Sequence, residues 1–150
     1  MSQRNPGRRA PLRLPHQYRG SVNRRIYTTG RRFERIFGYA RAVRVGPIIE
    51  IAGCAPIDPE GKLVGGTDVY EQTRQCLRVI VEALNGVGAG LEDVTRTRIF
   101  TTVPRRWREI GRAHAEVFTA IKPVTALIGV RGFLEAGWLV EIEATAYRVD

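Results

Sequence analysis

The sequence has few of the residues from which metal sites, disulfide scaffolds and membrane spans are built. Its 150 residues include two cysteines, Cys54 and Cys76, and two histidines, His16 and His114. So few thiols and imidazoles argue against a zinc site and a disulfide framework, and they favour a reducing cytoplasm. No apolar run approaches the roughly 20 residues of a transmembrane helix, and the N-terminus lacks the apolar core of a secretory signal. We therefore expect a cytoplasmic protein with no metal and no membrane partner.

The signature motifs of several enzyme classes are also missing. There is no GxSxG nucleophile elbow, no Walker A loop, no GxGxxG after a predicted strand and no HExxH pair. These absences argue against serine hydrolases of that type, nucleotide-binding loops and zinc peptidases, and no cofactor is expected. His114 falls on the apolar side of a predicted helix, so a core or boundary position is preferred to the role of a catalytic base. Cys76 is likewise expected to be a small core residue.

Positive charge is plentiful but confined to one end of the chain. The net charge is +9; residues 1–32 hold nine arginines and no acidic residue, whereas residues 33–150 carry fifteen basic and fifteen acidic side chains. Prolines and few apolar residues accompany the arginines, which predicts a flexible basic tail at residues 1–31 and one domain at residues 32–150. A transit peptide is an alternative for the tail, although its prolines oppose an amphipathic helix. The neutral domain makes nucleic acid an unfavoured partner.

The hydrophobic pattern predicts an α+β domain. Strands are expected at 32–37, on both sides of a Gly46-Pro47 turn within 41–52, and at 94–103, 124–130 and 138–148. Helices are expected at 69–85, with Asp68 as the N-cap, and at 105–121. The predicted order β-β-β-α-β-α-β-β allows both helices to cover one face of a mixed sheet and leaves the other face open.

Side-chain alternation makes the two faces of this sheet different. The residues of the last strand expected to face the helices are Val140, Ile142, Ala144 and Ala146. The opposite side of that strand carries Leu139, Glu141, Glu143, Thr145 and Tyr147. In the preceding strand the more apolar set is assigned to the helices, which leaves Thr125 and Leu127 on the open face. A face that mixes carboxylates, hydroxyls and apolar groups suits a subunit interface or a wet pocket.

Glu141 and Glu143 are the most informative pair of residues. Two carboxylates at positions i and i+2 of a strand share a face, and within an otherwise apolar strand each needs a partner or a raised pKa. One interpretation is a pair of interface salt bridges. The other is that one carboxylate positions a water molecule or shuttles a proton in a pocket.

Several segments of the chain form a recognisable series. They are GYARAVRVG at 38–46, IEIAGCAPIDPEGKLVGG at 49–66, EQTRQCLRVIVEAL at 71–84, GLEDVTRTRIF at 90–100, Pro123-Val-Thr and VEIEATAYR at 140–148. In this order and spacing they resemble the Rid family (reactive intermediate deaminase, older name YjgF). The resemblance implies a chorismate-mutase-like fold, with a mixed six-stranded sheet backed by two helices on one face. It also implies a homotrimer with small-molecule pockets between neighbouring subunits.

The resemblance also assigns candidate site residues. Deaminases of the family hydrolyse 2-imino or enamine acids to 2-oxo acids, using a glutamate that positions water and an arginine that holds the substrate carboxylate. The glutamate matches Glu141, the candidate catalytic residue. The positions that match the rest of the pocket are Tyr39, Ala52, Gly53, Thr125 and Leu127. Thr125 stands at the position of the arginine, and Leu127 stands where a cysteine is frequent.

Thr125 is the main departure from the family pattern. A guanidinium donates two parallel charged hydrogen bonds to a carboxylate, whereas a threonine offers one neutral bond. A standard 2-imino acid deaminase is therefore not expected. Arg98 and Arg131 are candidate replacement cations, and solvated or salt-bridged side chains are the alternative for both.

Three functions from different classes follow. The first is a Rid-type enzyme that adds water to a small reactive metabolite, imine-like, enamine-like or related. The second is a non-catalytic trimeric protein that binds a small molecule in the same pockets. The third and least favoured is an RNA-binding or endoribonuclease-type protein that uses the basic tail.

Overall fold

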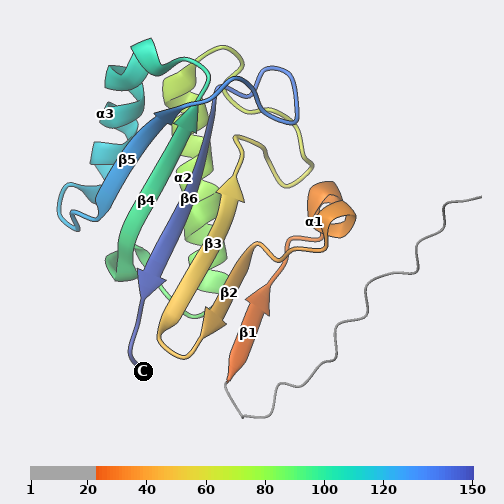
Figure 1. The fold of residues 1–150 in the computed structure, drawn as a ribbon, viewed down its shortest axis with the longest axis vertical. Coiled ribbons are helices and arrows are strands. Elements are labelled where there is room, and N and C mark those ends of the chain that lie inside the picture. The colour runs from red at the N-terminus through yellow and green to blue at the C-terminus, as the bar shows by residue number, and fades with distance from the viewer. Residues whose placement is uncertain (1–22) are drawn as a thin grey trace, which may run out of the picture.

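A six-stranded mixed sheet, covered on one face by two long helices, forms the body of the chain (Figure 1). This computed structural model describes residues 23–150. The strands are β1 (Arg24–Tyr27), β2 (Ala42–Val45), β3 (Ile48–Cys54), β4 (Val94–Thr101), β5 (Val124–Gly129) and β6 (Val140–Tyr147). The α-helices are α1 (Arg32–Phe37), α2 (Val69–Gly86) and α3 (Trp107–Phe118). Short 3-10 turns at Leu91–Asp93 and Pro104–Arg106 precede β4 and α3.

The order of the strands across the sheet is β1-β2-β3-β6-β4-β5. Neighbouring strands are antiparallel, except that β4 and β5 run parallel. The helices α2 and α3 lie on the same side of this sheet (Figure 1). The six-stranded mixed sheet implied by the family resemblance is therefore confirmed. None of the helices in the described part of the chain is long and apolar enough to cross a membrane.

Local sequence signals account for the elements that frame the site. The strands β2 and β3 form a hairpin in which Val45 pairs with Ile48, and Gly46 in the turn has a φ of 57°. That left-handed conformation favours glycine. Helix α2 begins at the predicted cap, because the Asp68 side chain accepts hydrogen bonds from the backbone N–H groups of Tyr70 and Glu71. The predictions of the hairpin and of the capped helix are both confirmed.

The core lies between the sheet and the two long helices. The inward-facing residues of β6 are buried as predicted: Val140, Ile142, Ala144 and Ala146. Their core partners come from β3, α2 and α3, and include Ile49, Ile80, Leu84 and Ile110. Burial of each large aliphatic side chain contributes about 1.5–3 kcal/mol. The strand that carries Glu141 is therefore held rigidly against the helices.

Residues 32–37 form the helix α1, so the prediction of a strand there is wrong. Phe33, Ile36 and Phe37 are spaced three and four residues apart, a pattern that suits one helical face. The buried Glu34 stabilises the turn before the helix, because its carboxylate accepts hydrogen bonds from the backbone N–H groups of Thr29 and Gly30. In so short a segment these tertiary contacts outweigh the strand propensity of the apolar residues.

The strand β1 lies within the segment predicted as tail. It pairs antiparallel with β2 at the edge of the sheet, and its residues are mostly exposed. An edge strand without a buried face has no hydrophobic alternation to reveal it. Residues 1–22 of the predicted tail lie outside the described residues.

The predicted placement of Thr125 and Leu127 on the open face is wrong. The strand β6 lies between β3 and β4, and β5 is an edge strand paired only with β4 among the described strands. Thr125 lies beside Thr97, which is fully buried on the helix side of the sheet. Every residue of β5 is exposed in a single chain, so the contrast between its two faces is too weak to assign them from the sequence.

Candidate functional site

Glu141 lies in a hollow between α1, the end of β3 and the start of β6. The hollow has a volume of about 210 Å³, and its lining includes Tyr39, Arg41, Gly53, Leu134, Trp138 and Glu141. We call it the Glu141 hollow. Three of the site residues implied by the family resemblance, Tyr39, Gly53 and Glu141, therefore lie around one cavity.

Arg41 is the cation of this hollow, and the sequence analysis did not single it out. Its side chain is 5% exposed. It donates from Nε to Glu34 Oε1 at 3.1 Å, from Nη2 to the Tyr39 hydroxyl at 3.0 Å and from Nη1 to the Gly53 carbonyl at 2.5 Å. Arg41 thus joins α1, the segment before β2 and the end of β3. Residues 39–41 precede β2 and are not part of a strand, so no periodic pattern in the sequence marks Arg41 as a partner of Tyr39.

The charge of Arg41 is balanced within the chain by Glu34, whose side chain is 3% exposed. A buried ion pair of this kind holds its neighbours in fixed positions, and removal of one partner leaves the other charge uncompensated. Arg41 therefore orients Tyr39 and the Gly53 backbone more than it offers a free charge to a ligand.

Glu141 and Glu143 differ although they share one strand and one face. Glu143 Oε1 forms an ion pair with Arg98 Nε at 2.5 Å. None of the ion pairs in residues 23–150 involves Glu141. Burial raises the pKa of Glu141, an effect that Arg41 opposes and Glu143 reinforces. The salt-bridge interpretation thus applies to Glu143, and Glu141 is left as a half-buried carboxyl group facing a cavity.

Gly53 is required for the position of this carboxyl group. A Cβ atom at residue 53 would lie 2.9 Å from Glu141 Cδ and closer still to Oε1. Such overlap forces the Glu141 side chain to leave its position or one of the two strands to shift. The close approach explains why a residue without a side chain stands at the end of β3.

We expect Gly53→Ala to lower the free energy of unfolding by about 1–3 kcal/mol, because the new methyl group overpacks the hollow. Urea denaturation measures the change. The matched control is Gly132→Ala, since a Cβ at Gly132 would meet no atom within 4 Å, and its effect should stay within about 0.5 kcal/mol. Equal stability of the two variants would contradict the proposed close approach.

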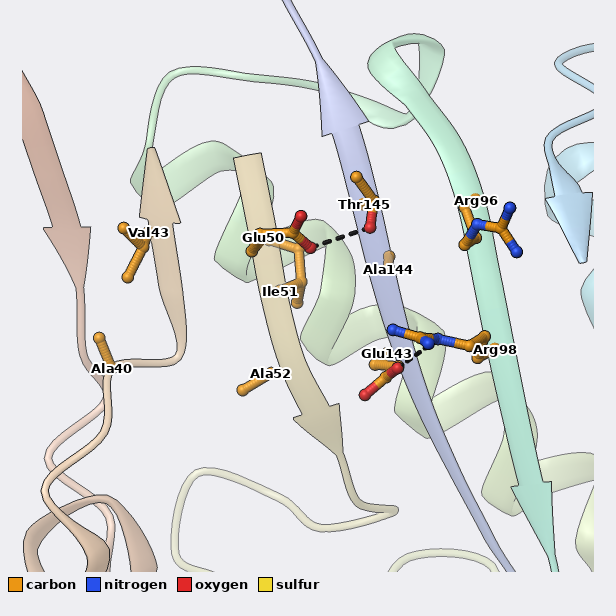
Figure 2. Close-up of a pocket in the computed structure, with 10 residues that line it drawn as sticks. All are labelled: Ala40, Val43, Glu50, Ile51, Ala52, Arg96, Arg98, Glu143, Ala144 and Thr145. Atoms are coloured by element: carbon orange, nitrogen blue, oxygen red, sulfur yellow. Dashed lines mark hydrogen bonds and ion pairs between the residues drawn. The ribbon is translucent and has the colours of Figure 1, made fainter. Parts of the chain in front are cut away.

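Two of the predicted binding residues, Ala52 and Arg98, lie in a second hollow on the open face of the sheet (Figure 2). This open-face hollow has a volume of about 280 Å³. Figure 2 shows Arg98 reaching across from β4 to Glu143 on β6, while Glu50 accepts a hydrogen bond from the Thr145 hydroxyl at 2.9 Å. Arg98 is thus salt-bridged, as one interpretation held, and the structure does not place it beside Glu141. Arg131 is exposed in the loop after β5.

Thr125 and Leu127 lie in a third depression, at the outer edge of the sheet on the helix side. This edge recess has a volume of about 410 Å³, and Trp107 and His114 of α3 also line it. The Thr97 hydroxyl lies 2.8 Å from the Thr125 hydroxyl and 2.9 Å from His114 Nε2. His114 is half-buried and packs against Phe118, which is the predicted boundary position. Within one chain, the strand β4 therefore lies between Thr125 and Glu141, and the two residues are on opposite faces of the sheet.

Comparison with known sequences finds one matching family model and several relatives. A family model described as Endoribonuclease L-PSP matches residues 29–148. An uncharacterised protein of Streptomyces coelicolor is 40% identical over 120 residues, which cover 80% of this chain and 89% of that protein. The 3-aminoacrylate deaminase RutC of Acinetobacter baylyi is 29% identical over 109 residues, which cover 73% of this chain and 86% of that protein.

A solved structure shows the same fold at higher identity. The protein comes from Mycobacterium tuberculosis and is described as a member of the YjgF/YER057c/UK114 family. It is 44% identical, with a TM-score of 0.77, and the match covers 84% of this chain and 100% of that chain. The family match spans α1, α2, α3 and the strands β2 to β6. The chain therefore belongs to the Endoribonuclease L-PSP family, also called the YjgF or Rid family.

Proposed function

We propose that this protein is a Rid-type hydrolase that adds water to a small reactive metabolite, imine-like, enamine-like or related, in a pocket completed between subunits. The observation that carries the proposal is Glu141: a carboxyl group with a pKa raised by burial, without an ion-pair partner in the described chain, facing a cavity. A raised pKa brings a carboxylate closer to the operating pH, where it serves as an acceptor and donor of protons.

The proposed step uses Glu141 to activate water. The carboxylate takes a proton from the water molecule while the water oxygen bonds to the imine carbon. The electron pair of the C=N bond moves to nitrogen, and the Glu141 carboxyl group returns the proton to that nitrogen. In the resulting amino alcohol the hydroxyl proton passes to nitrogen through the same carboxyl group, the C–N bond breaks with loss of ammonia, and a carbonyl group forms. Tyr39, Arg41 and Gly53 keep the hollow in shape around this carboxyl group.

A homotrimer is part of the proposal because one chain does not bring the matching residues together. Thr125 and Glu141 lie on opposite sides of the sheet, so a shared pocket needs Thr125 of one subunit to face Glu141 of another. Apolar side chains exposed on the open face also favour a subunit contact there, among them Ile48, Ile128 and Tyr147. We expect light scattering to give about three times the chain mass of 16.8 kDa. A folded monomer at micromolar concentration would contradict this assembly.

We expect 2-aminoacrylate and related 2-imino acids to be poor substrates. Without the arginine at position 125, kcat/KM should be about 10- to 100-fold lower than that of an arginine-bearing family member, the worth of one or two charge-assisted hydrogen bonds. The assay generates the imine in situ with an amino-acid oxidase and follows ammonia release. Thr125→Arg should raise the rate if the pocket is otherwise complete. A wild-type rate equal to that of the arginine-bearing enzyme would refute the prediction.

The alternative function is binding without turnover. Thr125 favours this alternative, because a threonine lacks the charged group that would orient a carboxylate substrate. In that case the chain would bind imine analogues yet leave the rate of ammonia release unchanged for every imine tested. Glu141→Gln would then alter ligand affinity only. These outcomes separate the binding protein from the hydrolase.

A further inference from the structure

The edge recess contains a chain of three hydrogen-bonding side chains. His114 of α3, Thr97 of β4 and Thr125 of β5 follow one another at 2.9 and 2.8 Å. Thr97, the middle member, is fully buried, so water does not reach it. The rest of the recess is lined by uncharged residues, Ile99, Pro104, Trp107, Gly111 and Leu127. Of these three side chains, Thr125 is the one that lies on an exposed strand.

The number of polar hydrogens on these three side chains decides whether Thr125 can donate a hydrogen bond to a ligand. Each threonine hydroxyl has one hydrogen and can accept from other donors. If His114 carries its proton on Nε2, it donates to Thr97, Thr97 donates to Thr125, and the Thr125 hydrogen is free to point into the recess. If His114 carries its proton on Nδ1, Thr97 donates to Nε2, Thr125 donates to Thr97, and only lone pairs of Thr125 face the recess. The tautomer of His114 therefore sets the polarity that Thr125 presents.

We propose that His114 and Thr97 act as positioning residues that hold the Thr125 hydroxyl as a hydrogen-bond donor toward the pocket, so that this protein selects ligands with an uncharged acceptor, such as the carbonyl of an amide, in place of a carboxylate. The inference deepens the proposed function and rests on the composite pocket described there. A carboxylate that loses its water needs a charged partner, and the recess has no charged lining residue. An amide carbonyl needs one donor, and its apolar substituents fit beside Trp107 and Leu127.

Burial gives this arrangement further support. Desolvation lowers the pKa of His114, so the neutral ring that the tautomer argument requires is the dominant form at neutral pH. Only one hydrogen-bond partner of the ring, Thr97, is found among the described residues. The contact with Phe118 fixes the orientation of the ring.

Arg31 is the residue that argues for the opposite preference. It lines the Glu141 hollow, and its buried Nε has no hydrogen-bond partner in the described part of the chain. In a composite pocket, this cation of the facing subunit would instead hold a carboxylate. The experiment must therefore separate a donor at Thr125 from a cation at Arg31.

The test titrates the full chain with pyruvamide and pyruvate, which differ in charge but have nearly the same size. Chemical shifts of the backbone amides give the two affinities. We expect pyruvamide to bind about tenfold more tightly than pyruvate. Pyruvamide accepts one hydrogen bond from Thr125, whereas the carboxylate of pyruvate loses its hydration without gaining a charged partner in the recess. Thr125→Val, which keeps the shape and removes the hydroxyl, should abolish this preference. The matched control is Thr95→Val, since Thr95 is an exposed hydroxyl of the neighbouring strand β4 and lies outside the recess, and it should keep the preference.

A second measurement tests the role of His114 directly. The ¹⁵N shifts of its ring report the tautomer, and addition of pyruvamide should move the population toward the form protonated on Nε2. His114→Gln keeps an N–H donor at this place and should retain most of the preference for pyruvamide, whereas His114→Phe should lose it. A purely structural role of His114 would predict loss of stability in both variants with no change of tautomer on binding.

Three results would overturn the inference: equal affinities, tighter binding of pyruvate, or bound pyruvamide with His114 protonated on Nδ1. If pyruvate binds more tightly and Arg31→Gln removes that advantage, the anchor is Arg31. Neither probe has to be hydrolysed, so the inference and the proposed function fail separately. A preference for pyruvamide in a protein that hydrolyses no imine would disprove the hydrolase and leave the inference standing. Efficient hydrolysis of 2-imino acids together with a preference for pyruvate would disprove the inference and leave the hydrolase standing.

Discussion

Glu141→Gln is expected to reduce imine hydrolysis by about 100-fold or more, the usual contribution of a positioned general base. Glutamine keeps the shape of the side chain but does not accept a proton from water. The rate is measured with the imine that the wild-type protein hydrolyses fastest. The matched control is Glu143→Gln on the same strand and face, because Glu143 is engaged by Arg98 and lies outside the Glu141 hollow. Equal losses in the two variants would show that the charge of the open face, and not Glu141 itself, supports the reaction.

The same variant should be at least as stable as the wild-type protein, and the difference should depend on pH. Burial raises the pKa of Glu141 in the folded chain above its value in the unfolded chain. The folded state therefore binds this proton more tightly, and the stabilisation is fully present below the unfolded pKa and is lost as pH rises through the folded pKa. Glutamine has no such titration. Urea denaturation between about pH 4 and 8 should show the wild-type protein losing stability relative to Glu141→Gln as pH rises.

A marked loss of stability in Glu141→Gln at neutral pH would contradict this interpretation. It would mean that Glu141 is an ion-pair partner across the subunit contact, because removal of one member of a buried pair leaves the other charge uncompensated. All stability measurements need equal protein concentration, since subunit association contributes to the apparent free energy of unfolding.

Arg41→Met is expected to lower the free energy of unfolding by about 3–5 kcal/mol. Methionine fills much of the space but leaves the carboxylate of Glu34 buried without its cation, and it removes the hydrogen bonds to Tyr39 and to the Gly53 carbonyl. Urea denaturation measures the change. The matched control is Arg98→Met, because the Arg98 side chain is 49% exposed. Loss of such a surface pair should cost no more than about 1 kcal/mol.

A double-mutant cycle with Glu34→Gln separates the pair from its surroundings. The two single variants should each be destabilised, and the double variant should be less destabilised than the sum of both. Strict additivity would show that Arg41 and Glu34 act independently, and the hollow would then be held by packing alone. Loss of ligand binding in Arg41→Met without loss of stability would instead make Arg41 a direct ligand contact.

The sequence by itself determined the elements whose signals are local. Asp68 caps α2 through its own neighbours, Gly46 permits the tight turn between β2 and β3, and the alternation of β6 separates its buried face from the face with Glu141. The motif series also identified the family, which the match over residues 29–148 confirms. These features depend on residues a few positions apart, where backbone preference and side-chain spacing leave little choice.

The tertiary structure alone decided the features that depend on distant partners. Insertion of β4 between β6 and β5 separates Thr125 from Glu141, and no window of sequence contains that pairing. Arg41 becomes the cation of the hollow because it meets Glu34 and the Gly53 carbonyl, which come from other elements. The face of the edge strand β5 was assigned wrongly, because its residues are exposed on both sides and only Thr97 and His114 orient Thr125. Burial and strand pairing are properties of the assembled sheet, so a site built across strands emerges only when the strands have met.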